Sequence, residues 1–249
     1  MELNCMNNIK ILCVIPSRIG STRLPRKALV PIQGKPMVQW TYENALRCRS
    51  MTKVVVATDS MEIAEVIAGC GGTVEMTDVN IPTGSDRAAV VAERYPEMDV
   101  IINLQGDEPF IKPQMLDELA RPFLNGEAPE MATLAFPLLP HEMSDPGVVK
   151  IVTDLRGNAL YFSRSMIPFQ RQPSVGALYH HMGIYAFRRD FLLRFTKLSQ
   201  GPLELTESLE QLRALEHGHK IRVCLTQHRT LEVNTPEELA MAQEFAYEA

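Results

Sequence analysis

Short apolar runs alternate with amphipathic segments over the first half of the chain. The runs have the pattern of strands buried on both faces, at residues 11–16, 53–58 and 101–104. Between them, apolar residues recur at helical spacing, over residues 36–49, 61–68 and 113–124, with an alanine-rich helix ending near residue 95. This alternation predicts an α/β fold in which helices cover both faces of a parallel sheet.

The second half has a different pattern. Four segments rich in β-branched and aromatic residues predict a β-rich extension with antiparallel pairs, at residues 131–138, 148–153, 159–162 and 179–187. One helix is expected over residues 206–216, capped by Thr206, and late strands at residues 221–225 and 231–233. Thr235 and Glu238 form a capping box before a last helix. With no linker in the sequence, we expect one domain over residues 1–249, with halves of about 10–125 and 126–249.

Composition and charge restrict the class of protein. The net charge of −5 argues against non-specific binding to nucleic acid. No window approaches the length of a membrane-spanning apolar segment, and the first ten residues lack the order of a signal peptide. The five cysteines are odd in number and lack metal-ligand spacing, so reduced thiols are expected. We therefore expect a cytoplasmic protein without a membrane partner.

A cationic segment follows the first apolar run. No Asp or Glu occurs from Leu3 to Tyr42, whereas the loop over residues 17–27 contains glycine, small hydroxyl residues and four cations. Backbone N–H groups and basic side chains of this kind can hold a phosphate, although the spacing matches neither a Walker loop nor a dinucleotide-binding loop. A solvated basic loop is the alternative, and the missing counter-charges favour the phosphate site.

The run at residues 101–104 leads directly into Gln105, Gly106, Asp107, Glu108 and Pro109. Because proline cannot donate to a sheet ladder, the chain is expected to leave the sheet there, with the two carboxylates at the carboxyl edge of an inner strand. Ligands of open α/β sheets bind at that edge, and a carboxylate held there suits Mg²⁺. Taken alone, the segment also fits a solvated acidic turn.

Other polar residues leave two interpretations open. Ser85 or Asp86 could cap the alanine-rich helix, which is the simpler interpretation, or Gly84 and Ser85 could offer N–H groups to a ligand. His181 and Tyr185 share one face of a predicted strand. At another strand end, Arg164 could clamp a carboxylate or form a surface ion pair. Glu210 and Gln211, beside a leucine stripe, are expected on a solvated helix face.

Several motifs together resemble those of 3-deoxy-D-manno-octulosonate (Kdo) cytidylyltransferases. In the first half they are Pro16-Ser17-Arg18, Ser21-Thr22-Arg23-Leu24-Pro25 with Lys27, Ala57-Thr58-Asp59, Thr83-Gly84-Ser85-Asp86-Arg87 and Leu104-Gln105-Gly106-Asp107-Glu108-Pro109. In the second half they are Tyr161-Phe162-Ser163-Arg164, His181-Met182-Gly183-Ile184-Tyr185 and Leu209-Glu210-Gln211-Leu212-Arg213. The resemblance extends from about residue 11 to residue 245.

The resemblance implies a GT-A-like three-layer sandwich with a mixed, mostly parallel sheet, and a homodimer. It also implies transfer of CMP from CTP to a 3-deoxy sugar acid, with Mg²⁺ as cofactor, release of pyrophosphate and a place in lipopolysaccharide biosynthesis. The first half would hold the nucleotide, through Arg18, Ser21, Lys27, Gly84, Ser85, Arg87 and Gln105, with Arg18, Lys27 and Asp107 catalytic. The second half would hold the sugar acid, through Arg164, His181, Tyr185, Glu210 and Gln211, and form the dimer. Asp107 would bind the metal.

The chain departs from the family pattern near the expected active centre. The family's second metal carboxylate is the aspartate of a Val-Asp-Thr-Pro-Glu motif, where this chain has Asn234. Because an amide offers a neutral oxygen, we expect a weaker or altered Mg²⁺ site. Arg26 replaces a glycine and is expected to add charge beside the triphosphate, and Ser165-Met166 replaces Ala-Pro on the sugar side.

These departures leave alternatives open. One is a paralogue that acts on a modified sugar acid, and another is a catalytically weak subunit that binds a nucleotide sugar. A GT-A glycosyltransferase shares the acid at the strand end but does not explain the basic loop.

Overall fold

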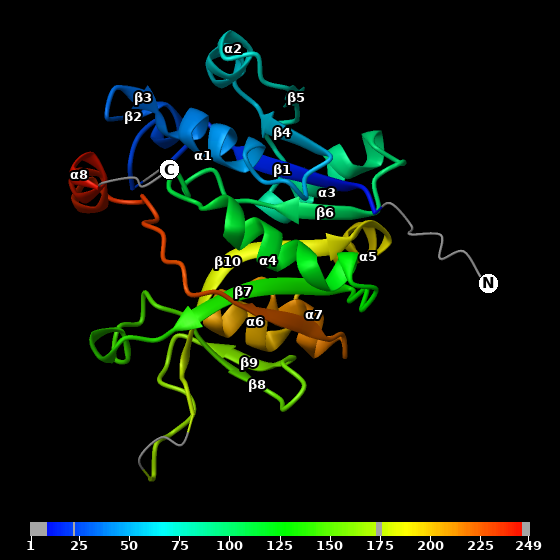
Figure 1. The fold of residues 1–249 in the computed structure, drawn as a ribbon, viewed down its shortest axis with the longest axis vertical. Helices are drawn as coiled ribbons and strands as arrows, with labels where there is room; N and C mark the ends of the chain where they lie inside the picture. The colour runs from blue at the N-terminus through cyan, green and yellow to red at the C-terminus, as the bar shows by residue number, and fades with distance from the viewer. Residues whose placement is uncertain (1–8, 22, 173–175, 246–249) are drawn as a thin grey trace.

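One sheet runs through both halves of the chain. The computed structural model describes residues 9–21, 23–172 and 176–245, and Figure 1 shows their arrangement. The sheet follows the order β11-β7-β10-β6-β1-β4-β5. Its strands are β1 (Ile11–Ser17), β4 (Lys53–Thr58), β5 (Val74–Met76), β6 (Val100–Asn103), β7 (Met131–Pro137), β10 (Tyr179–Arg188) and β11 (Ile221–Leu225).

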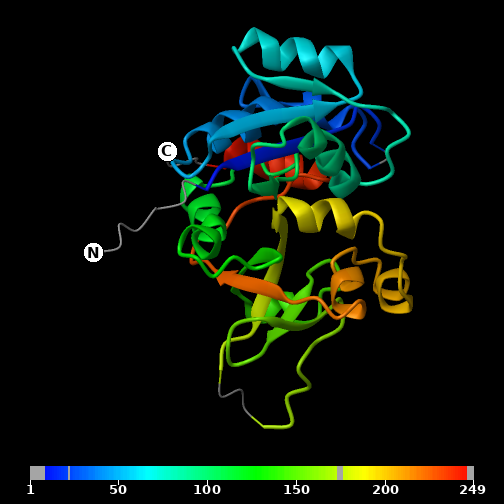
Figure 2. The same ribbon diagram turned by 90° about the vertical axis from the view of Figure 1, so that its right-hand side faces the viewer.

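The side chains of β1 explain the layers. Ile11, Cys13 and Ile15 pack into one apolar cluster, and Leu12 and Val14 pack into another on the opposite face. The first cluster includes residues of α1 (Met37–Leu46), α2 (Met61–Gly69) and α4 (Pro113–Leu124). The second includes residues of α3 (Gly84–Arg94), α5 (Arg189–Phe195) and α7 (Leu212–Glu216). The predicted three-layer sandwich is confirmed, and Figure 2 shows it from the side.

The pairing places the carboxyl ends of three neighbouring strands together. β1 pairs in parallel with β4 and β6, and β10 runs antiparallel to β6 and β7. β7 and β11 are parallel, so β10 is the strand on this described path that runs against the others. The sheet is therefore mixed and mostly parallel, as predicted, and β1, β4 and β6 end at the same edge.

Of the four segments predicted to form a β-rich extension, two are β7 and β10 of the main sheet. The other two form a hairpin of β8 (Lys150–Thr153) and β9 (Ala159–Ser163), attached to β10 through β8. Four short elements lie elsewhere: the paired strands β2 (Pro31–Ile32) and β3 (Lys35–Pro36), and the 3-10 turns η1 (Lys27–Leu29) and η2 (Pro140–Glu142). The last helix, α8 (Pro236–Glu244), begins at the predicted capping box of Thr235 and Glu238. A third apolar cluster joins Ala242 of α8 to Met37, Ile32 and Phe110.

The single helix predicted over residues 206–216 is wrong. Two short helices, α6 (Pro202–Glu207) and α7, are separated at Ser208, which has the left-handed conformation (φ 53°). Thr206 does not cap a helix and donates instead to the carbonyl of Pro202. The leucine spacing continues across the break because Leu209 and Leu212 both pack into the core beneath it.

Two other expectations fail. Residues 231–233 form no strand, because this segment pairs with no strand of the described sheet; the N–H of Val233 donates to the carbonyl of Asp107. The cap of α3 is Thr83, whose Oγ1 accepts from the N–H of Asp86, so neither Ser85 nor Asp86 caps it. No helix in the described part of the chain combines the length and apolar character needed to cross a membrane.

Candidate active site

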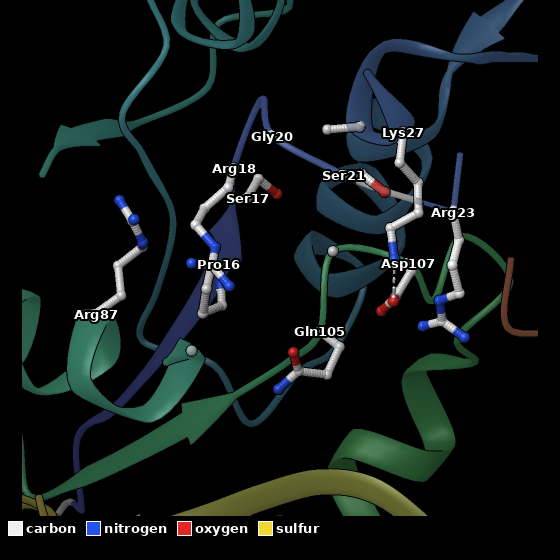
Figure 3. Close-up of a pocket in the computed structure, with 13 residues that line it drawn as sticks. Pro16, Ser17, Arg18, Gly20, Ser21, Arg23, Lys27, Arg87, Gln105 and Asp107 are labelled. Atoms are coloured by element: carbon white, nitrogen blue, oxygen red, sulfur yellow. Dashed lines mark hydrogen bonds and ion pairs between the residues drawn. The ribbon is translucent and has the colours of Figure 1, made fainter. Parts of the chain in front are cut away.

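A cavity of about 470 Å³ opens at the edge where β1 and β6 end. Four cationic side chains line it together with one carboxylate, that of Asp107. Figure 3 shows Arg18 and Arg87 on one side of the cavity, and Lys27 and Arg23 on the other. The structure therefore brings Asp107, predicted to be catalytic and to bind the metal, together with most of the residues predicted to hold the nucleotide: Arg18, Ser21, Lys27, Gly84, Arg87 and Gln105.

Gly106 allows the turn after β6 to approach the end of β1. A Cβ atom at this position would lie 2.5 Å from Ser17 Oγ and 3.0 Å from the carbonyl oxygen of Pro16. Any larger residue would push the turn away from β1, and Asp107 with it. The glycine thus sets the distance between Asp107 and the basic loop.

Lys27 bridges Asp107 and Asn234, the residue at which the chain departs from the family pattern. Its Nζ donates to Asp107 Oδ2 at 2.5 Å and to Asn234 Oδ1 at 2.7 Å. Arg23 also donates to Asn234 Oδ1, at 3.1 Å. The loop, the turn after β6 and the segment before α8 therefore meet at one cationic centre.

Glu232, which the sequence analysis did not identify, lies beside Asn234. Asn234 Nδ2 donates to Glu232 Oε1 at 2.6 Å, and the N–H of Asn234 donates to Glu238 Oε2 at 2.6 Å. The capping box of α8 thus orients Asn234. In an extended segment, alternate residues lie on the same side. Glu232 and Asn234 flank the buried Val233, so this spacing in the sequence could have predicted that they lie side by side.

The two adjacent carboxylates of the acidic turn have different environments. Asp107 lines the cavity, whereas Glu108 is buried and its Oε2 accepts from Thr230 Oγ1 at 3.1 Å. Burial raises the pKa of Glu108 well above its ordinary value, and the nearby Glu232 and Asp107 carboxylates add to this effect. Asp107 is therefore the carboxylate of this turn that can meet a ligand.

Arg87 reaches the cavity from α3 with its guanidinium almost fully buried. Nη1 donates to Thr77 Oγ1, and Nη2 lies 3.8 Å from Asp59 Oδ2. Burial lowers the pKa of Arg87, although the Asp59 carboxylate opposes this shift. Besides this ion pair, Nη2 has no hydrogen-bond partner within the described residues, so it can still donate a hydrogen bond to an anionic oxygen.

Four residues predicted to bind the sugar acid lie together: His181, Tyr185, Glu210 and Gln211. Tyr185 Oη donates to Gln211 Oε1 at 3.0 Å, and the rings of Tyr185 and His181 are 5.6 Å apart. Gln211 is buried and its Nε2 has no partner in the part of the chain that is described.

Glu210 connects this group to the cavity. Glu210 Oε2 accepts from Ser85 Oγ at 2.6 Å, and Oε1 accepts from Thr83 Oγ1 at 3.0 Å. Asn103 Nδ2 in turn donates to Ser85 Oγ at 3.2 Å. The expectation that Glu210 and Gln211 lie on a solvated helix face is therefore wrong, because the break at Ser208 turns both toward the sheet.

The fifth predicted sugar-acid residue, Arg164, has other partners. Its Nε donates to the carbonyl of Glu207 at 3.0 Å, and its Nη1 donates to the carbonyl of Pro146 at 3.1 Å. Ser163 Oγ also donates to Glu207, at 2.6 Å. Glu207 thus holds the end of β9. Neither the carboxylate clamp nor the surface ion pair predicted for Arg164 is formed with a described residue.

Arg26 does not lie beside the cavity, contrary to the expectation that it adds charge near the triphosphate. Its guanidinium forms an exposed ion pair with Glu62 of α2. Its backbone is left-handed (φ 56°), which explains why a glycine suits this position.

Comparison with known proteins agrees with this geometry. The sequence model of the cytidylyltransferase family matches residues 12–221. The chain belongs to the cytidylyltransferase family. A 3-deoxy-manno-octulosonate cytidylyltransferase of Acaryochloris marina is 50% identical over 238 residues, which cover 95% of this chain and 97% of the relative.

Two further cytidylyltransferases bear on the substrates. A solved structure of CMP:2-keto-3-deoxy-manno-octonic acid synthetase complexed with CTP is 40% identical, with a TM-score of 0.89 over 95% of this chain and 100% of that one. An 8-amino-3,8-dideoxy-manno-octulosonate cytidylyltransferase of Shewanella loihica is 44% identical over 240 residues, or 94% of this chain and 98% of the relative. The predicted GT-A-like fold is confirmed by the similarity to the solved synthetase.

Proposed function

We propose that this cytidylyltransferase transfers CMP from CTP to 3-deoxy-manno-octulosonate, forming CMP-Kdo and releasing pyrophosphate. The observation that carries the proposal is the cavity at the carboxyl edge, where four cationic side chains surround Asp107. It is joined through Ser85 and Glu210 to a second polar group that contains Gln211, Tyr185 and His181. Two substrates, one a polyanion, fit these adjoining regions.

The triphosphate fits the cationic cavity. Arg18, Lys27 and Arg87 would neutralise phosphate oxygens and hold the α-phosphate in line with the attacking hydroxyl. Nη2 of Arg87, which can still donate a hydrogen bond, supports this role. Phosphoryl transfer depends on such positioning and charge stabilisation, because the protein supplies little covalent chemistry. Gln105, Gly84 and Ser21 lie where they can contact the nucleotide.

The residues around Asp107 also fit Mg²⁺. Asp107 and Asn234 present oxygens that face the same ammonium group, with the Glu232 carboxylate next to Asn234. No group of three or more His, Cys, Asp or Glu side chains suited to a metal occurs in the described residues. Mg²⁺ commonly takes one or two protein ligands and completes its shell with phosphates and water, so two oxygens suffice. When bound, the ion would polarise the phosphate oxygens.

The sugar acid would occupy the region of His181, Tyr185, Glu210 and Gln211. Each carboxylate oxygen of Glu210 already accepts one hydrogen bond, from Thr83 or Ser85, and has a second lone pair that can accept from a sugar hydroxyl, so sugar binding would be linked to the start of α3. Arg164 would have to turn from backbone carbonyls to the substrate carboxylate. These roles follow the family resemblance and the positions of the residues.

We further propose a cytoplasmic homodimer that supplies CMP-Kdo for lipopolysaccharide biosynthesis. Exposed apolar side chains support pairing through the β8–β9 region, since Leu155, Leu160 and Phe169 are 108%, 61% and 88% exposed. An apolar patch of this kind commonly marks a protein interface. Sedimentation of the wild type and of Phe169→Ser would test the pairing.

The function is tested by incubating the protein with CTP, Mg²⁺ and a panel of sugar acids, and measuring pyrophosphate. Kdo and its 8-amino analogue are the decisive members of the panel, because relatives act on each. Release with Kdo supports the proposal. Release with the 8-amino acid alone would instead indicate a paralogue for a modified sugar, and CTP binding without release from any acid would indicate a binding subunit.

A further inference from the structure

Thr133 lies in the middle of β7, opposite an irregularity in β10. The pairing changes there from Met182 opposite Leu134 to Tyr185 opposite Thr133. The side chain of Thr133 is fully buried, and its hydroxyl faces backbone carbonyls of the irregular segment of β10. Oγ1 lies 3.1 Å from the carbonyl oxygen of Met182, 2.9 Å from that of Ile184 and 3.0 Å from His181 Nε2.

The number of protons around this hydroxyl determines the direction of each hydrogen bond. A threonine hydroxyl carries one proton and two lone pairs, and a carbonyl oxygen can only accept. If Thr133 donated to His181 Nε2, two carbonyl oxygens would face its oxygen with no proton between them. The hydroxyl must therefore donate to a carbonyl of Met182 or Ile184. It then accepts an N–H from His181 Nε2.

The charge of the His181 ring determines whether its second ring nitrogen, Nδ1, carries a proton. His181 is 6% exposed, and burial lowers its pKa from 6.5 to about 3, so the ring is neutral near pH 7. A neutral imidazole carries one proton, and Nε2 holds it. Nδ1 is consequently an acceptor. No hydrogen bond to Nδ1 is formed by the described residues.

We propose that Thr133 is a positioning residue that fixes the tautomer of His181, so that Nδ1 accepts a hydrogen bond from a hydroxyl of the sugar acid. This inference rests on the proposed function. A carboxylate has no proton to donate at neutral pH, so His181 would discriminate for a hydroxyl and leave the substrate carboxylate to a cation. The ring is also held by Phe162, edge-on at 4.8 Å, and by Tyr185.

Steady-state kinetics of two variants provide the first test. Thr133→Val keeps the shape but removes the hydroxyl, and is expected to raise the KM for Kdo about tenfold while the KM for CTP changes less than about twofold. Thr133→Ser keeps the hydroxyl and should remain within about threefold of the wild type. Equal losses in both variants, or equal changes in both KM values, would overturn the proposal, because either result indicates a purely structural role.

The nitrogen resonances of histidine-labelled protein provide a test that needs no turnover. His181 is assigned by the signal lost in His181→Asn. In the wild type we expect a protonated Nε2 and an unprotonated Nδ1, and in Thr133→Val a mixture of both tautomers. A wild-type Nδ1–H tautomer would refute the inference. This measurement also separates the inference from the proposed function, because the tautomer of His181 can be observed in a protein that is inactive with Kdo. If Thr133→Val does not fold, the wild-type spectrum alone tests the inference.

Discussion

Lys27 Nζ lies 2.7 Å from Asn234 Oδ1, although 207 positions separate the two residues. The same ammonium group lies 2.5 Å from Asp107 Oδ2. The lysine thus compensates the carboxylate that is proposed to bind Mg²⁺. When CTP is bound, its phosphates would draw Lys27 toward them and leave the Asp107 carboxylate to the ion.

Replacing Asn234 by Asp is expected to lower the Mg²⁺ concentration that half-saturates turnover, on the order of threefold to tenfold, because it adds an anionic ligand. Titrating turnover with Mg²⁺ at saturating CTP measures this. The control is the double variant Asn234→Asp, Glu232→Gln, which exchanges the amide and the carboxylate. The net charge stays the same, and one of the two side chains can still donate a hydrogen bond to the other. A Mg²⁺ dependence unchanged in Asn234→Asp would show that Asn234 does not bind the metal.

Arg26→Gly is expected to stabilise the fold slightly. The left-handed backbone of a non-glycine residue costs about 1–2 kcal/mol, and glycine gives back about 0.5–1 kcal/mol through the unfolded state. The exposed pair with Glu62 adds little. We expect a Tm higher by about 1–3 °C and a KM for CTP within about twofold, since Arg26 does not line the cavity. A strongly raised KM for CTP would place the guanidinium at the triphosphate after all.

Arg213 forms a buried ion pair with Glu204 across the break between α6 and α7. Its Nε and Nη2 donate to the two carboxylate oxygens at 2.8 and 2.6 Å. Arg213→Ala leaves a buried carboxylate unpaired, so the free energy of unfolding should fall by about 3–5 kcal/mol in urea titrations. Arg222→Ala, which removes a more exposed pair with Glu127, should change it by less than about 1 kcal/mol. Similar losses of unfolding free energy in both variants would show that burial does not determine how much an ion pair contributes to stability.

His181 makes the protein sensitive to acid. Its pKa is lowered by burial to about 3, so between that value and 6.5 the unfolded chain binds a proton that the native protein does not. Stability therefore falls as the pH drops below 6.5. From about pH 6.5 to 4.5 this histidine should account for about 2–3 kcal/mol.

Urea titrations at both pH values, for the wild type and His181→Asn, measure this contribution. The variant should lose less stability on acidification than the wild type, by about 2–3 kcal/mol. His217→Asn, at an exposed position, should retain the wild-type dependence. Parallel pH dependences for the wild type and His181→Asn would show that this histidine does not cause the acid sensitivity.

Local signals in the sequence predicted most of the framework. The helix of residues 113–124 was placed with the observed bounds because Pro113 begins it and Asn125-Gly126 ends it. The strands at the centre were predictable because each is a continuous apolar run between turn residues. The juxtaposition of the basic loop with Asp107 followed from the rule that parallel strands end at one edge.

Features that depend on distant contacts were not predictable. The break at Ser208 leaves the leucine spacing intact, so the pattern favoured one helix. Glu210 was assigned to solvent because its partners, Ser85 and Thr83, are about half the chain away. Glu232 carried no motif, and its place near Lys27 and Asp107 is known only once the segment before α8 is placed against the loop.

The last helix has a consequence for handling the protein. The N–H of Gln33 donates to Gln243 Oε1, and Gln243 Nε2 donates to the carbonyl of Pro31, so α8 is held against the β2–β3 hairpin. Asn234 immediately precedes Thr235, the cap of α8. Truncations or fusions at the carboxyl terminus would therefore alter catalysis and not only solubility, and an affinity tag is better placed at the opposite end.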